Sequence, residues 1–356
     1  MKLFESYHLG PISLKNRIVM APMTRCRALD NIPNDLMATY YAQRASAGLL
    51  ITEGTSPSPN GVGYARIPGI YSDAQIKGWK KVTEAVHREN GKIFIQLMHT
   101  GRVSHPDNMP EGTTVLAPSA VPLEGEMYTD QNGMQTYPLA KEMSLQDIET
   151  AKNEYVQAAK NAIEAGFDGV EPHGANGYLI DQFINPTTNQ RKDTYGGSAA
   201  NRNRFPLEVA QAVAEAIGAD RTGIRLSPYG VFNGMGIFEG IDEAYFELTQ
   251  GLSNLGLVYL HVVDHSALGA PEVPQQTKET MRKAFAGTFI LSGGYDKERA
   301  EKDLENGKGD LVAFGRPLLA NPDLPKRLEE GLELNEPDQN TFYTADETGY
   351  TDYSFA

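Results

Sequence analysis

One short segment of the chain carries three side chains that could act together on a carbonyl compound. His173-Gly-Ala-Asn176-Gly-Tyr178 places an imidazole, an amide and a phenol within six residues. If the segment turns into a helix, His173 and Asn176 can point the same way while Tyr178 points elsewhere. Two groups could then hold an oxygen while the third protonates the carbon next to the carbonyl. The alternative is a structural histidine, a turn asparagine and a packing tyrosine.

Two further segments could bind a phosphate. They are Ser292-Gly293-Gly294-Tyr295 and Phe314-Gly315-Arg316. Glycine lets backbone N–H groups approach an anion closely, and a guanidinium can pair with it through two hydrogen bonds. Either segment alone could be an ordinary turn, but both follow strand-like runs. Together they predict a bound phosphate.

A flat redox ring would explain a third group of residues. Ala21-Pro22-Met23-Thr24 follows the first strand-like run, Gln96 lies in the third and Arg225 in the fifth. An amide edge and a fixed positive charge suit a heterocycle that becomes negative on reduction. An ion pair with a neighbouring carboxylate is the alternative role for Arg225.

Metal and thiol chemistry find little support in the sequence. His261 and the Asp264-His265 pair could suggest a metal site, but no third ligand is evident, so no metal is predicted. Cys26 is the single cysteine, which excludes an internal disulfide and a site with several thiolates. We assign Cys26 no function.

Eight strand-like runs are needed to bring these residues together. Short apolar runs alternate with longer segments of helical period, a pattern typical of βαβ winding. Eight such units predict a (β/α)₈ TIM barrel, whose reactive groups lie at the carboxyl ends of the strands. The runs are Arg17–Met20, Leu49–Glu53, Ile93–Leu97, Gly169–His173, Gly223–Ser227, Tyr259–Val263, Phe289–Ser292 and Leu311–Phe314.

Eight helical segments alternate with these runs. A doubly wound open sheet is the competing α/β fold, but no glycine-rich dinucleotide motif follows the first strand. The predicted helices are Asn34–Ala47, Asp73–Glu89, Ser144–Ala165, Asn201–Ile217, Asp242–Leu255, Thr277–Ala286, Lys297–Asn306 and Pro322–Glu330.

Two segments lie outside this repeat. His99–Met143 is too long for an ordinary connection, and we expect it to be an excursion over the barrel mouth with short strands near Thr114–Ala117 and Met134–Tyr137. The tail Leu334–Ala356 is rich in aromatic residues, which favours folding back onto the body. We therefore expect a single domain over residues 1–356.

Charge and hydropathy limit the partners of the protein. Asp and Glu outnumber Lys and Arg by 46 to 32, and no basic stripe exists, so no nucleic acid partner is expected. No apolar run approaches the roughly 20 residues that span a bilayer, and the first ten residues lack a signal-peptide pattern. We expect a cytoplasmic protein without a membrane partner, either a monomer or a weak homo-oligomer.

Taken in order, these motifs resemble the old yellow enzyme family over essentially the whole chain. Those that carry the likeness are Asn16-Arg17-Ile18, Ala21-Pro22-Met23-Thr24, Gln96, His173-Gly-Ala-Asn176-Gly-Tyr178, Tyr195-Gly-Gly197, Arg225-Leu-Ser-Pro228 and Phe314-Gly-Arg316. The resemblance implies an FMN-containing barrel that takes hydride from NADPH or NADH. It passes the hydride from flavin N5 to the β-carbon of electron-poor alkenes, which are α,β-unsaturated carbonyl or nitro compounds.

The resemblance also implies roles for individual residues. His173 and Asn176 would bind the substrate oxygen, and Tyr178 would protonate the α-carbon. The remaining roles belong to two groups. The cofactor-binding residues would be Ala21, Pro22, Met23, Thr24, Gln96, Arg225, Gly293, Gly294, Gly315 and Arg316, and the substrate pocket would also include Tyr64, Tyr350 and Met98.

Three positions depart from the family pattern. Met98 stands where tryptophan is frequent, which predicts a roomier pocket. Pro172 removes a ladder donor beside His173, and Ala200 replaces a common glutamate. Two alternative functions remain. One is a phosphate-binding aldolase or isomerase, although no lysine occupies a strand end. The other is a flavin-binding protein without turnover, in which Pro172 has disrupted the catalytic site.

Overall fold

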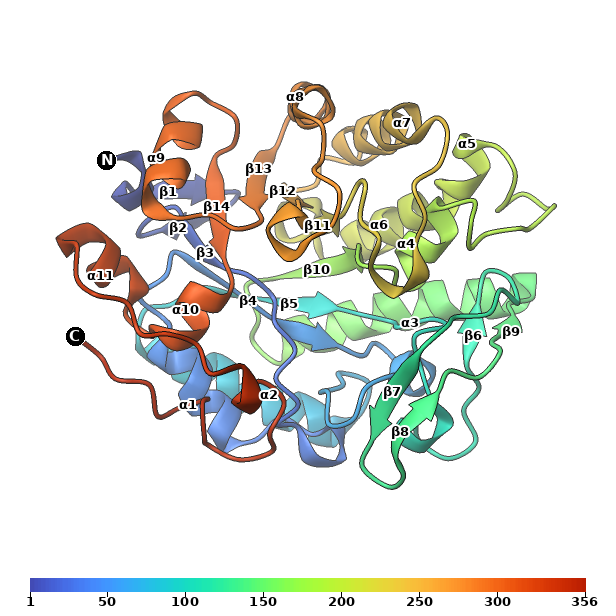
Figure 1. Ribbon diagram of the computed structural model, residues 1–356, viewed down its shortest axis with the longest axis horizontal. Coiled ribbons are helices and arrows are strands. Elements are labelled where there is room, and N and C mark those ends of the chain that lie inside the picture. Colours follow the sequence, from blue (N-terminus) through green and yellow to red (C-terminus); the bar gives the residue numbers. More distant parts are fainter.

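Eight parallel strands close into a barrel at the centre of the computed structural model, which describes residues 1–356 (Figure 1). The predicted barrel is confirmed, and the open sheet is excluded because the two end strands pair with each other. All eight predicted runs form barrel strands. In chain order these are β3 Ile18–Met20, β4 Leu49–Thr55, β5 Ile93–Leu97, β10 Gly169–Gly174, β11 Gly223–Leu226, β12 Tyr259–Val263, β13 Thr288–Ser292 and β14 Leu311–Phe314.

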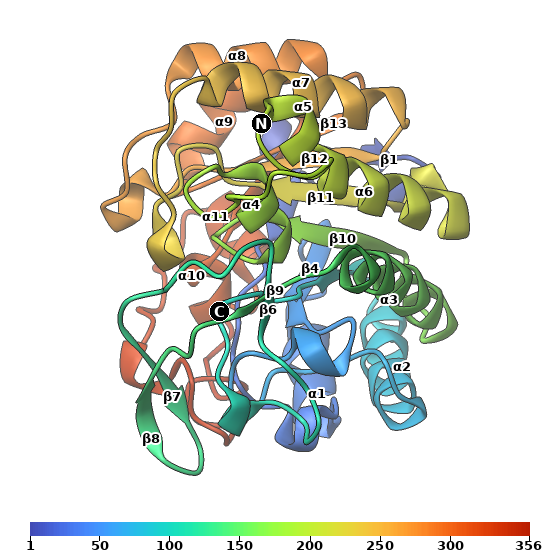
Figure 2. The same cartoon turned by 90° about the vertical axis from the view of Figure 1, so that its right-hand side faces the viewer.

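Helices surround this barrel, and two orthogonal views show them on its outside (Figures 1 and 2). Every residue of the eight strands is buried, as expected where helices cover the outside and side chains fill the inside. The helices are α1 Asp35–Gln43, α2 Asp73–Arg88, α3 Leu145–Glu164, α4 Leu179–Ile184, α5 Ala199–Arg202, α6 Arg204–Ile217, α7 Ile241–Asn254, α8 Gln275–Ala284, α9 Lys297–Glu305, α10 Arg316–Ala320 and α11 Leu324–Glu330.

Local sequence signals explain where several helices begin. Ser72 and Ser144 form complete capping boxes at α2 and α3, and the partner of Ser144 is Asp147. The predicted helix Asn201–Ile217 is divided into α5 and α6, and the Ser198 side chain caps the first of them. The substitution at Ala200 lies in α5, and α5 forms without a glutamate there.

A small hairpin that the sequence analysis did not predict closes the amino end of the barrel. Its strands are β1 Tyr7–Leu9 and β2 Ile12–Leu14. Leu9 and Leu14 pack into one buried cluster with interior side chains of the barrel, among them Leu49 and Tyr259. That end is therefore filled, and a ligand can enter only from the carboxyl end.

The excursion and the tail both lie at that carboxyl end. The excursion contains a parallel pair, β6 Leu116–Ala117 with β9 Lys141–Glu142, and a hairpin, β7 Glu126–Thr129 with β8 Gly133–Thr136. Both views place the hairpin and the red C-terminal tail on the same side of the barrel (Figures 1 and 2). The excursion is confirmed as a cap over the mouth.

Candidate active site

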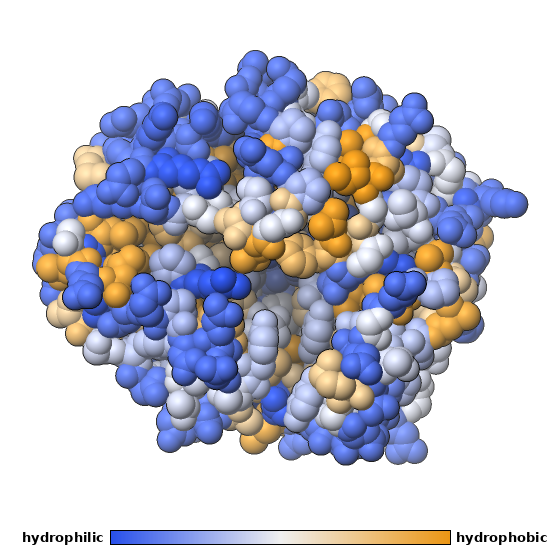
Figure 3. Space-filling view, viewed as in Figure 1, coloured by the Kyte–Doolittle hydropathy of each residue, from blue (hydrophilic) through white to orange (hydrophobic).

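A cavity of about 1140 Å³ opens at the carboxyl ends of the strands. The space-filling view shows it as a hollow near the middle of the molecule, with hydrophobic residues on parts of its rim (Figure 3). Its lining comes from the barrel, the excursion and the tail. All the expected site residues except Tyr350 line it.

The floor of the cavity is a polar layer inside the barrel. Glu171 is fully buried, and its two oxygens accept hydrogen bonds from Gln96 Nε2 at 2.7 Å and pair with His261 Nδ1 at 2.9 Å. Nearby positive charge and these hydrogen bonds hold the pKa of Glu171 below its usual value despite burial. Because Gln96 gives its NH₂ group to Glu171, its amide oxygen remains available to a ligand.

Arg225 is the one residue of this floor without a partner. It lies beside His173 in the register of β10 and β11 and is only 5% exposed. Its Nε has no hydrogen-bond partner, and the guanidinium forms no direct ion pair, although the charge of Glu171 acts on it from a distance, so the alternative role for Arg225 is not supported. A buried charge without a partner is costly unless a ligand supplies one. This orphaned guanidinium fits the electron-rich edge of a flavin.

His173 presents a hydrogen-bond donor to the cavity. Its Nδ1 lies 3.3 Å from the backbone nitrogen of Ala175 and accepts from that N–H. Burial and the charge of Arg225 lower the pKa of His173 well below its usual value, so the ring is neutral. In a neutral ring whose Nδ1 accepts, the proton lies on Nε2. The strand runs through Pro172 without a break, so Pro172 does not turn His173 away from the cavity.

A tight turn after β10 positions Asn176. Asn176 and Gly177 both have positive φ, 61° and 76°. The backbone N–H of Asn176 donates to Ser227 Oγ at 2.8 Å, and that of Gly177 donates to the Asp181 carboxylate at 2.9 Å. A Cβ at Gly177 would lie 2.7 Å from the carbonyl oxygen of Phe232, so only glycine fits.

The Asn176 side chain has one partner, His265, whose Nε2 lies 2.6 Å from Asn176 Oδ1. An amide oxygen can only accept, so the His265 nitrogen must donate. Burial, with a contribution from Arg225, lowers the pKa of His265 to about 4, and its ring is therefore neutral at pH 7. The NH₂ group of Asn176 is left without a partner in the chain.

Tyr178 lies beside His173 and Tyr64. The His173 and Tyr178 rings meet edge to face at 5.0 Å, and the hydroxyl oxygens of Tyr178 and Tyr64 are 3.1 Å apart. Burial raises the pKa of Tyr178 to about 12, so its hydroxyl keeps its proton at neutral pH. Tyr64, Tyr178 and Met98 share a small apolar cluster, and Gly54 leaves the space that the Met98 sulfur occupies.

At the carboxyl end of the neighbouring strands β13 and β14, the predicted phosphate residues come together. Gly293 has φ 126°, and a Cβ there would lie 1.9 Å from the carbonyl oxygen of Asp264. Gly294, Gly315 and Arg316 line the same end, and Arg316 forms no ion pair within the chain. Neighbouring glycines and an unpaired guanidinium are suited to a phosphate. The Thr24 hydroxyl also lacks a partner within the chain and lines this cavity.

The expectation for Tyr350 is wrong. Tyr350 is fully buried outside the cavity, with its ring stacked on Tyr40 at 3.9 Å and covered by the guanidinium of Arg27. The tail residues that line the cavity are Asn340, Phe342, Tyr343 and Thr344, so its inward-facing aromatic rings are Phe342 and Tyr343. The aromatic composition of the tail does not show which of its rings faces inward.

Other lining residues were also missed. Phe232, Asn233 and His265 come from loops after β11 and β12; no local motif marks Phe232 and Asn233, and the sequence suggested His265 only as a metal ligand. Cys26 lies at the edge of the cavity, where burial raises the pKa of its thiol to about 12 and leaves it unreactive. His261 and His265 pair with different neighbours, and no cluster of three or more histidine, cysteine or acidic side chains suits a metal ion.

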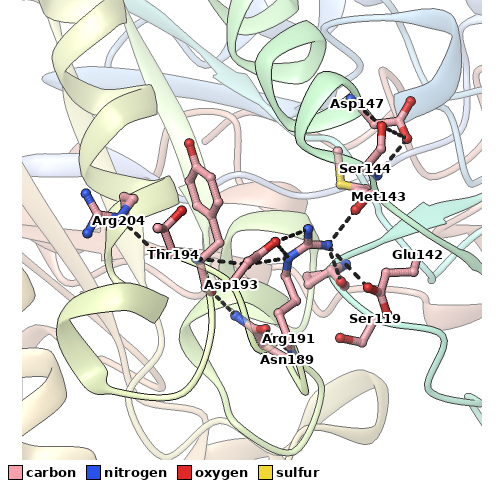
Figure 4. Close-up of polar contacts among 12 residues, drawn as sticks. Ser119, Glu142, Met143, Ser144, Asp147, Asn189, Arg191, Asp193, Thr194 and Arg204 are labelled. Carbon is pink, nitrogen blue, oxygen red and sulfur yellow. Dashed lines mark hydrogen bonds and ion pairs between the residues drawn. The ribbon is translucent and has the colours of Figure 1, made fainter.

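Two arginines, the buried Arg191 and the partly exposed Arg66, fasten the segments that form the roof. Arg191 donates to the carbonyl oxygens of Pro118, within the excursion, and of Met143, at its end, and pairs with Asp193 (Figure 4). Arg66 donates to the Cys26 and Tyr343 carbonyl oxygens and pairs with Asp130 in the β7–β8 hairpin. The roof is thus tied to the barrel from several sides.

Comparison with known proteins decides the family. A model of the "NADH:flavin oxidoreductase / NADH oxidase family" matches residues 2–335. The chain belongs to this family. It is similar to 12-oxophytodienoate reductase 1 of Oryza sativa subsp. japonica, with 42% identity over 99% of this chain and 93% of that protein.

Two solved structures agree with the family assignment. Morphinone reductase in complex with tetrahydroNAD is 46% identical, with a TM-score of 0.96 over 100% of this chain and 98% of that one. The old yellow enzyme homologue from Zymomonas mobilis is 40% identical, with a TM-score of 0.96 over 99% of both chains. The resemblance stated from the motifs is confirmed, and the protein is an oxidoreductase of an FMN-dependent family. No helix has the length and apolar character needed to cross a membrane.

Proposed function

We propose that this chain binds FMN in the cavity and reduces the C=C bond of α,β-unsaturated carbonyl or nitro compounds. The observation that carries the proposal is one shared cavity for His173, Asn176 and Tyr178, with the unpaired Arg225 in its floor. An aldolase or isomerase would use a lysine or a set of metal ligands. No lysine lines the cavity, and no group of three or more histidine, cysteine or acidic side chains could hold a metal ion. An oxidoreductase that acts on electron-poor alkenes fits this set of side chains best.

FMN would be held along the length of the cavity. Arg225 and the amide oxygen of Gln96 would bind the pyrimidine end of the ring, and the Thr24 hydroxyl would bind a ring carbonyl. When bound, FMN supplies the redox chemistry, accepting a hydride from a nicotinamide and passing it from N5 to the β-carbon of the alkene. The ring would rest on Ala21, Pro22 and Met23, and the phosphate on Gly293, Gly294, Gly315 and Arg316.

His173 and Asn176 would bind the substrate oxygen. His173 Nε2–H and the NH₂ group of Asn176 both offer protons, and a carbonyl or nitro oxygen accepts them. These hydrogen bonds strengthen as negative charge develops on the oxygen, so they stabilise the transition state more than the bound substrate. Met98 and Tyr64 would contact the rest of the substrate.

Tyr178 would complete the reduction by donating a proton to the α-carbon. Its high pKa keeps the donor protonated, and the Tyr64 hydroxyl at 3.1 Å can return a proton afterwards. One hydride at the β-carbon and one proton at the α-carbon together reduce the double bond, while the nicotinamide is oxidised. The donor would be NADPH or NADH, and the solved complex of morphinone reductase with tetrahydroNAD supports a nicotinamide in such a cavity.

An absorbance spectrum of the purified protein is the first test. We expect a yellow protein whose flavin absorbance is bleached in anaerobic titration with NADPH or NADH and restored by 2-cyclohexenone. A protein that binds no FMN would contradict the proposal. A yellow protein that is bleached but does not reduce 2-cyclohexenone would support the alternative of flavin binding without alkene turnover.

A further inference from the structure

His265 has no role so far beyond its hydrogen bond to Asn176. We propose that His265 is a positioning residue that fixes the Asn176 amide with its NH₂ group toward the substrate, so that the site favours ligands whose bound atom is purely a hydrogen-bond acceptor. The inference rests on the proposed function and extends it to substrate choice. It names a residue outside the His173-Gly-Ala-Asn176-Gly-Tyr178 segment.

The orientation of the Asn176 amide depends on His265 alone. The backbone N–H of Asn176 is bound to Ser227, and its carbonyl oxygen accepts from Asn233 Nδ2 at 2.7 Å. These contacts fix the backbone but not the side-chain amide, whose oxygen and nitrogen have nearly the same shape. The 2.6 Å contact between His265 Nε2 and Asn176 Oδ1 is the only hydrogen bond of this amide, and it distinguishes the two ends when the His265 proton lies on Nε2.

His265 is itself well held for this purpose. It lies just before the short 3₁₀ turn Ser266–Leu268, and its carbonyl oxygen accepts from the Leu268 N–H at 2.8 Å. Its ring meets Phe232 edge to face, with 4.6 Å between the centroids. A ring fixed by a turn and an aromatic contact can hold its N–H toward one acceptor with little further loss of entropy.

Without the His265 donor, the amide could turn over and present its oxygen to the cavity. An enone or nitro oxygen has only lone pairs and would then face another acceptor. The carboxamide of a nicotinamide carries both a C=O and an NH₂ group, so it can pair with either end of Asn176. Loss of His265 should therefore weaken alkene binding while sparing nicotinamide binding, a difference that a purely structural role would not produce.

Three variants of the FMN-loaded protein test this inference. His265→Phe keeps a ring against Phe232 but removes the donor, and His265→Gln retains an NH₂ donor. Ser266→Ala, in the same turn, is the matched control because Ser266 does not line the cavity. Two binding constants are measured by absorbance titration of the oxidised protein, one for 2-cyclohexenone and one for tetrahydroNAD. The rates of flavin reduction and of alkene reduction are measured separately by stopped flow.

We expect His265→Phe to bind 2-cyclohexenone about tenfold more weakly and to reduce it correspondingly more slowly, as the loss of one hydrogen bond predicts. Its tetrahydroNAD affinity and its flavin reduction rate should change less than about twofold. His265→Gln should recover most of the loss, and Ser266→Ala should match the wild-type protein.

Two results would overturn the inference. They are an unchanged 2-cyclohexenone affinity in His265→Phe, and an equal loss for both ligands in a variant that still binds FMN. A wild-type protein that fails to reduce 2-cyclohexenone would instead overturn the proposed function, and this inference with it. The wild-type measurement therefore separates the two failures.

Discussion

At the scale of single residues, the site works through groups whose charge states are set by burial. His173 and His265 are neutral, Tyr178 keeps its proton, and Arg225 keeps its charge without a partner in the chain. These states suit His173 to donate to the substrate oxygen and His265 to donate to Asn176. They also suit Tyr178 to supply a proton and Arg225 to pair with an anion.

Replacing Tyr178, the proposed proton donor, should affect alkene reduction and flavin reduction differently. We expect Tyr178→Phe to slow alkene reduction by about 10²–10⁴-fold, the usual contribution of a general acid, while flavin reduction by NADPH or NADH stays near the wild-type rate. Stopped-flow absorbance measures each half-reaction. Tyr71→Phe is the control because Tyr71 packs in the same apolar cluster but does not line the cavity. Equal losses in both half-reactions would remove Tyr178 from this role.

The protonation of Tyr178 and His173 should leave the rate of alkene reduction almost independent of pH between about 6 and 9. Burial raises the pKa of Tyr178 to about 12, and burial with Arg225 lowers the pKa of His173 well below its usual value. Neither residue therefore changes its protonation in this range. Single-turnover rates with 2-cyclohexenone across the range test this expectation, and a sigmoidal step near neutral pH would show that another group controls the rate.

At the scale of elements, the turn after β10 is held by a buried carboxylate on α4. Asp181 accepts from the Gly177 N–H, from Ser227 Oγ and from Tyr245 Oη. Burial nevertheless raises the pKa of Asp181 to about 7. The element that positions Asn176 and Tyr178 thus contains a carboxyl group that resists ionisation.

This carboxyl group should make the protein less stable as the pH rises. Between about pH 4 and 7 the native state keeps a proton that the unfolded chain has released, so the free energy of unfolding falls with a slope of up to about 1.4 kcal/mol per pH unit. Asp181→Asn cannot ionise and should lose this slope. Urea unfolding at pH 5, 6 and 7 measures it, with Asp352→Asn at an exposed site as the control. Parallel profiles for wild type and Asp181→Asn would contradict the expectation.

At the scale of the whole molecule, hydrogen bonds hold the C-terminal tail to Arg27, near the start of the chain, and so complete the wall of the cavity. The buried Arg27 guanidinium donates to the carbonyl oxygens of Thr341, Phe342 and Thr348 at 2.7–2.9 Å. These bonds place Tyr343 against the cavity while Tyr350 stacks on Tyr40. The tail is therefore part of the site and not an appendage.

Removing the arginine should release the tail. We expect Arg27→Met to destabilise the protein by about 1–3 kcal/mol in total, because water hydrates the carbonyl oxygens of the released tail, and to expose the tail to proteases. Limited proteolysis followed by mass spectrometry, with the thermal midpoint, measures both effects. Arg88→Met, at an exposed position on α2, controls for the loss of one positive charge. A tail as resistant as in the wild type would show that other contacts hold it.

Local patterns in the sequence were sufficient for the barrel and for most of the site. Each strand is a short apolar run, and parallel strands that close in one direction bring all their carboxyl ends together. His173, Arg225 and the glycines at Gly293 and Gly315 could therefore be placed from their positions after strands, without any knowledge of distant contacts.

The tertiary structure decided what depends on contacts between distant segments. It selected Tyr343 and buried Tyr350, and it joined His265 to Asn176 across 89 positions of the chain. Such pairs have no sequence pattern of their own, because they arise from loop paths and from the competition of buried polar groups for partners. The sequence by itself determined which groups reach the cavity from the strands, and only the folded chain determined how the loops orient them.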